Sequence, residues 1–173
     1  MPNWVRNNLR IKSNGEKTLE LLELLKNDKG EMTFSNLLPT PKELMDGTAP
    51  NNDLSDDDRA LLVSKYGHDN WYSWRLANWG CKWDADESIF YKQGDDWIIS
   101  FSTPWEPPTE FMKKLSEQFD KITFILQFAD ECIGSPPLGQ CIYKNGNEEY
   151  TDPGDKNEQF ADAVWSDEWY REN

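Results

Sequence analysis

Residues 71–84 constrain the fold more than any other segment, because they hold four tryptophans within fourteen positions. The large apolar ring of tryptophan makes such a segment either the anchor of a core or a stacking surface for a ligand. Trp71 and Trp74 are three residues apart and Arg75 is four from Trp71, so a helix places them on one face. Gly80 then suits the end of that helix. This spacing favours a helix packed into a core, with a binding surface as the alternative.

The charge of the chain limits its partners. Its 173 residues suit one domain, and thirty-two acidic against eighteen basic side chains leave a formal net charge of -14. This charge repels phosphate backbones and anionic membranes and attracts basic protein surfaces. We therefore expect a protein partner with a basic surface, no direct binding of nucleic acid and no membrane association.

The cysteines indicate free thiols in a reducing compartment, with a Cys132–Cys141 bridge across a hairpin as the alternative. Cys81, Cys132 and Cys141 are odd in number and lack the paired short spacings of zinc sites. No charged-then-apolar leader and no run of eighteen apolar residues is present, so nothing in the sequence exports or inserts the chain. We expect a cytoplasmic protein without metal or cofactor.

The order of predicted elements indicates an α+β fold. Alternating apolar residues predict strands, and three- to four-residue spacing predicts helices. The predicted strands cover 5–12, 88–92, 97–103, 122–128 and a segment around Cys141 and Tyr143, and the predicted helices cover 17–26, 56–66 and 107–119. This order fits a ferredoxin-like split βαβ sandwich, an antiparallel sheet with helices on one face. A Trp-rich helical insertion at about 31–86 would follow the first helix.

The last part of the chain differs in composition. Residues 147–173 hold nine carboxylates and two basic side chains, which is half of the net charge of -14. Phe160, Val164, Trp165 and Trp169 recur at helical spacing. We therefore predict one domain over 1–146 and an acidic, amphipathic helical tail over 147–173.

Five segments carry a resemblance to a known family: 1–9 with Met-Pro-Asn-Trp, 38–44 with Leu-Pro-Thr-Pro, 70–75 with Asn-Trp-Tyr-Ser-Trp-Arg, 78–85 with Asn-Trp-Gly-Cys-Lys-Trp-Asp-Ala, and 101–108 with Phe-Ser-Thr-Pro-Trp-Glu-Pro-Pro. In these segments the chain resembles the phage- and plasmid-encoded Api-type family, whose members carry the YubB ferredoxin-like domain. The resemblance implies this fold over roughly residues 1–145, a mobile-element origin and no assigned catalytic activity. Cys81 stands where the family usually has threonine. The acidic segment after residue 146 is expected to lie outside the family pattern.

The Trp-rich segment supplies the candidate binding residues, which are Arg75, Asn78, Trp79, Lys82, Trp83 and Asp84. Lys82 and Asp84 have opposite charge in an aromatic setting, so they either staple the insertion to the sheet or orient a ligand. Arg75 is expected to stack on Trp71 or Trp79.

Acidic residues supply a second candidate surface, made of Asp53, Asp56, Asp57, Asp58, Glu148, Glu149, Asp152, Asp155, Asp162, Asp167 and Glu168. We expect a non-enzymatic phage or mobile-element protein that acts by binding another protein. In its sharper form it is an acidic nucleic-acid mimic that inhibits a host defence or nucleic-acid enzyme. The simpler explanation of the charge is solubility.

Two alternatives come from other function classes. A metal-dependent hydrolase would act around His68 and Asp84, with Asp86 and Glu87, or Asp130 and Glu131, as further carboxylates. A single-stranded nucleic-acid-binding module would use sheet aromatics, which are Trp97, Phe101 and Phe124.

Overall fold

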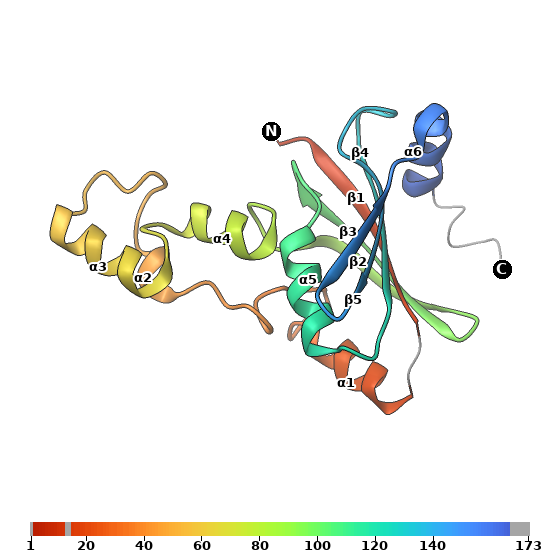
Figure 1. Ribbon diagram of the computed structural model, residues 1–173, viewed down its shortest axis with the longest axis horizontal. Helices are drawn as coiled ribbons and strands as arrows, with labels where there is room; N and C mark the ends of the chain where they lie inside the picture. The colour runs from red at the N-terminus through yellow and green to blue at the C-terminus, as the bar shows by residue number, and fades with distance from the viewer. Residues whose placement is uncertain (1, 13–14, 167–173) are drawn as a thin grey trace.

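A six-stranded antiparallel sheet forms the centre of the computed structural model, which describes residues 2–12 and 15–166 (Figure 1). The strands are β1 (Trp4–Ile11), β2 (Asp86–Gln93), β3 (Asp96–Pro104), β4 (Phe124–Asp130), β5 (Leu138–Lys144) and β6 (Asn147–Thr151). Their order in the sheet is β2-β3-β1-β4-β5-β6.

Six α-helices accompany the sheet in the described part of the chain. They are α1 (Glu16–Leu24), α2 (Lys42–Met45), α3 (Asp56–Tyr66), α4 (Trp71–Trp79), α5 (Thr109–Gln118) and α6 (Asn157–Trp165), with the 3-10 turn η1 (Gly154–Lys156) before α6. The first four strands with α1 and α5 form two interleaved βαβ units, in which β3 lies between β2 and β1. The predicted α+β class and antiparallel sheet are confirmed.

The main core lies between the sheet and its two central helices. Val5, Leu9 and Ile11 alternate along β1 and are fully buried on the side of α1 and α5. Leu21 of α1 and Phe111 of α5 cover them from the other side. Alternation thus fixes which face of the sheet is covered by these helices.

Helix α6 packs on the opposite face. Its Ala161 and Val164 form a second small cluster with Ala129 and Leu138 of the sheet. The side-chain amide of Asn8, which points away from the main core, donates to the Val164 carbonyl oxygen at 3.0 Å. Helices therefore lie on both faces, whereas the sequence pattern predicted them on one.

The sheet aromatics that the nucleic-acid-binding alternative required lie on the covered face. Phe101 and Phe124 are fully buried in the main core, and Trp97 packs against the same core. Phe101 and Phe124 are therefore not available to stack on bases, and Trp97 is partly buried beside them.

The sheet continues past the boundary predicted at residue 146. Asn145 and Gly146 have φ values of 47° and 74°, which is the geometry of a two-residue hairpin turn, and Lys144 pairs with Asn147. The first five residues of the predicted tail thus form edge strand β6. The Asn145-Gly146 pair is typical of a hairpin turn, but the acidic residues after it led to the prediction of a separate tail.

The Trp-rich segment folds as its spacing predicts. Helix α4 starts at Trp71, where the Asn70 side chain accepts a hydrogen bond from the Ser73 amide at 2.9 Å. It ends at Gly80, which adopts the left-handed conformation with φ 87°. Within the described ranges, no helix combines the length and apolar content needed to cross a bilayer.

Native-state thiol labelling tests this burial pattern. Cys132 is exposed, whereas burial raises the pKa of Cys81 and raises the pKa of Cys141 to about 11. Because the thiolate is the reactive form, we expect a disulfide reagent at mildly alkaline pH to modify Cys132 fast and the other two only after unfolding. In Cys132→Ser the fast labelling phase should be absent. Equal labelling rates for all three thiols of the wild type would contradict this burial pattern.

Candidate functional site

Helices α2, α3 and α4 with their connections form an arm, residues 42–79, that extends to one side of the sheet (Figure 1). The arm holds the first half of the Trp-rich segment at its base and α3 at its far end. All six predicted binding residues lie in α4 or directly after it. The base of the arm and the segment directly after α4 are therefore the place where the predicted site can be compared with the structure.

Trp79 anchors the base of the arm. Its ring is fully buried, with its centroid 5.6 Å from that of Phe34 and 6.2 Å from that of Trp74 in edge-on geometry. Its indole N–H donates to the Leu38 carbonyl oxygen at 3.0 Å. A buried tryptophan whose only donor is satisfied is a packing residue.

Arg75 closes this cluster from the outside. Its guanidinium lies 5.1 Å from the Trp71 ring centroid and 4.7 Å from that of Trp79, so the expected stacking is formed. Its Nε donates to Thr40 Oγ1 at 3.0 Å. Burial lowers the pKa of Arg75, and the nearby charge of Asp84 acts in the opposite direction.

Asp84 fastens the segment after α4 to the loop before α2. Its carboxylate accepts hydrogen bonds from the Phe34 amide at 2.6 Å, the Thr33 hydroxyl at 2.7 Å and the Ser35 hydroxyl at 3.0 Å. Lys82 instead lies over the rings of Trp83 and Tyr72, at 4.8 and 5.8 Å from their centroids. Asp84 is thus bonded to the 33–35 loop.

Asn78 joins the arm to α5. Its side-chain amide donates to the Trp74 carbonyl oxygen at 2.8 Å, and its Oδ1 accepts from Lys114 Nζ at 2.5 Å. Trp83, in contrast, is 38% exposed, and the centroid of its ring lies 6.4 Å from that of Trp4. Of the six predicted residues, Lys82 and Trp83 therefore face the surface, and the other four hold the base of the arm together.

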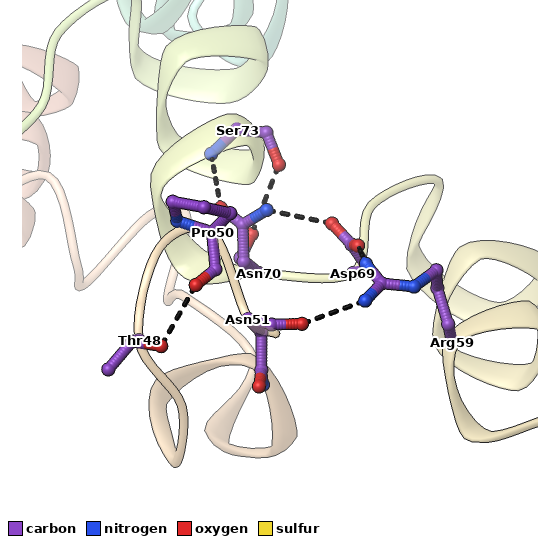
Figure 2. A network of polar contacts seen from close by, with 7 residues as sticks. All are labelled: Thr48, Pro50, Asn51, Arg59, Asp69, Asn70 and Ser73. Carbon is purple, nitrogen blue, oxygen red and sulfur yellow. Dashed lines mark hydrogen bonds and ion pairs between the residues drawn. The ribbon is translucent and has the colours of Figure 1, made fainter. Parts of the chain in front are cut away.

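A polar network fixes the far end of the arm (Figure 2). Arg59 of α3 forms an ion pair with Asp69 and also donates to the Asn51 carbonyl oxygen at 2.8 Å. Asn70 donates to Asp69 at 2.7 Å and caps α4 through Ser73. The network connects the loop before α3, α3 itself and the start of α4, so α3 has a defined position.

Helix α3 has well-formed ends but no buried side chain. Ser55 caps the helix, because its hydroxyl oxygen accepts a hydrogen bond from the Asp58 amide at 3.1 Å. Asp56 and Asp57 also lie in the first turn, where their negative charge interacts favourably with the helix dipole. Leu61 is nevertheless 65% exposed and Val63 46% exposed. The sequence does not show that these two residues are exposed, because a short apolar run such as Leu61-Leu62-Val63 is typical of buried residues.

The predicted acidic residues fall into separate groups. Asp53, Asp56, Asp57 and Asp58 lie on the arm, Glu148 and Glu149 on β6, and Asp152, Asp155 and Asp162 on the segment through η1 and α6. Helices α3 and α6 lie at opposite ends of the long axis in Figure 1. Asp167 and Glu168, like Trp169, lie outside the described residues.

The residues of the hydrolase alternative are not brought together. His68 precedes α4 and Asp84 follows it, and nine helical residues rise about 13 Å. Asp130 is buried and accepts a hydrogen bond from the Cys132 amide. The Glu87 carboxylate lies 3.8 Å from the Arg6 guanidinium. Among residues 2–12 and 15–166, no group of three or more His, Cys, Asp or Glu side chains is arranged to hold a metal ion.

Replacing Asp84 tests its structural role. In Asp84→Ala the Phe34 amide and two hydroxyls lose their charged acceptor, so we expect the free energy of unfolding to fall by about 3 kcal/mol. Urea denaturation measures this change. Asp86→Ala, at an exposed position in the same region, is the matched control and should change stability by less than about 1 kcal/mol. Equal effects of the two variants would contradict the assignment.

Replacing Arg59 tests the network at the far end. We expect Arg59→Ala to speed hydrogen exchange of the α3 amides by about tenfold, because the variant loses an ion pair and a hydrogen bond that hold the helix. Amides of α1 and α5 should keep their rates. Lys65→Ala, which removes the exposed pair with Glu43, should have a smaller effect. Unchanged exchange in Arg59→Ala would show that the network does not position α3.

Comparison with known proteins shows the family of the chain. A family model described as "Ferredoxin-like domain in Api92-like protein" matches residues 78–168, which is more than half of the sequence. Among curated proteins, none matches. A solved structure, the crystal structure of a protein api92 from Yersinia pseudotuberculosis, is similar at 12% identity with a TM-score of 0.49. The match covers 89% of this chain and 99% of that one.

The family match also corrects the expected extent of the resemblance. The acidic segment after residue 146 was expected to lie outside the family pattern, but the match runs to residue 168 and includes β6 and α6. Residues 42–77 of the arm, in contrast, precede the matched segment. The chain belongs to the family of Api92-like proteins that carry this ferredoxin-like domain.

Proposed function

We propose that the protein is a non-enzymatic binding protein of a phage or other mobile element, and that it acts in the host cytoplasm by binding another protein through the arm. The observation that carries this proposal is α3, a capped helix without a buried side chain that a polar network holds away from the sheet. Leu62 and Tyr66 of α3 pack partly buried against the core, whereas Leu61 and Val63 stay exposed, so this exposed side of α3 is available to a partner.

The surface of α3 indicates the chemistry of the partner. Leu61 lies four residues after Asp57 and three after Asp58, so an exposed apolar side chain is next to two carboxylates on the helix. Large exposed apolar side chains beside charges are typical of binding surfaces. We infer a partner surface that combines basic side chains with an apolar patch.

The position of the arm in the sequence supports the same proposal. Helices α2, α3 and α4 lie in the chain between α1 and β2 of the two interleaved βαβ units, where added residues leave the sheet order unchanged. We propose that these helices belong to a Trp-rich insertion at about 31–86, which adds a binding surface to a shared sheet. The segments that resemble phage- and plasmid-encoded Api-type proteins support the mobile-element origin.

The nucleic-acid-mimic form of the proposal receives less support. A mimic that fills a basic channel needs its carboxylates on one continuous surface. The acidic residues of the arm and those of α6 lie far apart along the long axis (Figure 1). We therefore propose recognition by the arm alone, and inhibition of a host defence or nucleic-acid enzyme as the consequence of this binding.

A binding experiment with arm variants tests the proposal. The immobilised full chain should retain a specific protein from host lysate at low salt and release it at high salt, and the purified partner should then bind the chain directly. We expect Leu61→Ser and Asp57→Asn each to weaken this binding by about tenfold, because each removes part of the contact surface.

Two matched controls make the result specific. Leu19→Ser removes a similarly exposed leucine from α1, and Glu149→Gln removes one carboxylate from β6. Both should bind like the wild type. If the arm variants bind as tightly as the controls, or if no partner is retained at either salt concentration, the proposal is wrong.

A further inference from the structure

A pocket of about 330 Å³ lies at the end of the sheet near the start of α5, separate from the arm. Residues from five distant parts of the chain line it, among them Glu106, Phe128, Glu148, Tyr150, Asp152 and Asn157. Its volume is within the range of small-molecule sites in proteins. The side chains of its walls determine which ligand it can bind.

One wall of the pocket is aromatic. The rings of Tyr150 and Phe128 are stacked, with centroids 6.5 Å apart and an angle of 27° between their planes. Tyr150 lies directly against Gly139, where a Cβ atom would come within 2.3 Å of the ring, and its hydroxyl donates to the Leu138 carbonyl oxygen at 2.9 Å. The ring is thus held in place before any ligand binds.

The polar side chains that line the pocket are mostly acceptors. Glu148, Tyr150 and Asp152 alternate on one side of β6 and its extension, and Glu106 faces them from the loop before α5. The charge of Glu148 is neutralised by an ion pair with Lys113, whose Nζ lies 2.8 Å from Glu148 Oε2. The Glu106 carboxylate has no ion pair or hydrogen bond to the described residues, and none of the described lining residues is basic.

A buried acceptor without a partner supplies independent support. The Oδ1 atom of Asn157 is inaccessible to solvent and accepts no hydrogen bond from the described residues. A buried carbonyl oxygen without a donor is costly. Because Asn157 lines the pocket, rotation of its side chain would bring this oxygen to a ligand that donates N–H groups there.

We propose that this pocket binds an organic cation, an alkylammonium or guanidinium group with an apolar stem. Glu106 and Asp152 supply the negative charge, the Tyr150 and Phe128 wall receives the stem or the face of the cation, and Asn157 accepts an N–H. Inorganic cations fit less well, because half of the named lining is aromatic or already neutralised. The same chemistry belongs to a free diamine and to a lysine or arginine side chain of a protein.

Titration of the isotope-labelled full chain tests this proposal by NMR. The probes are 1,5-diaminopentane, N-acetyl-lysinamide and the uncharged N-acetyl-norleucinamide. We expect saturable shifts of the Gly139, Tyr150 and Asn157 signals with the two amines and none with norleucinamide. Tighter binding of the diamine would identify a free amine as the ligand type, and tighter binding of the lysine derivative a protein side chain.

Variants separate a specific site from general attraction to an acidic protein. Glu106→Gln and Tyr150→Leu should each weaken amine binding by about tenfold, since each removes one wall of the site. Glu149→Gln, which changes the net charge equally on the opposite side of β6, should leave the affinity unchanged. Absence of saturable shifts, or equal loss in Glu149→Gln, would overturn the proposal. Neither result would bear on the arm, whose variants leave this pocket intact.

Discussion

The burial of Trp79 is the interaction on which the two parts of the structure depend. Its ring belongs to the last turn of α4 but packs against Phe34, whose own ring contacts Phe101 of the sheet and Phe111 of α5. One side chain thus connects the arm, the loop before it and the main core. Arg75 and Asp84 add polar contacts around the same point, and Leu62 and Tyr66 of α3 pack partly buried against the same core.

Local signals in the sequence were sufficient for most elements. The spacing of Trp71, Trp74 and Arg75, together with Gly80, marked α4, and alternation marked the strands that build the sheet. The exception, β6, shows the limit of composition, because acidic residues with an Asn-Gly turn before them form an edge strand when the neighbouring strand offers a partner. Backbone pairing depends on what lies beside a segment, which a single segment does not reveal.

The candidate sites could be predicted only in part, for a related reason. The sequence identified the Trp-rich segment but not that Trp79 faces inward and Trp83 outward, since this depends on the 33–41 segment that packs against it. Nor did it distinguish the exposed Leu61 from a core leucine. The pocket near β6 had no local signal at all, because Glu106, Phe128, Tyr150 and Asn157 meet only in the folded chain.

The edge position of β6 has a consequence for how the acidic end of the chain can be studied. A chain that ends at Gly146 would lose the strand that pairs with β5, and the backbone N–H and C=O groups of Leu138–Lys144 that now bond to β6 would have no partner. Such open edges join to one another between molecules. Shortening this protein would therefore favour its self-association, and a change in binding after truncation would report aggregation of the sheet as readily as loss of charge.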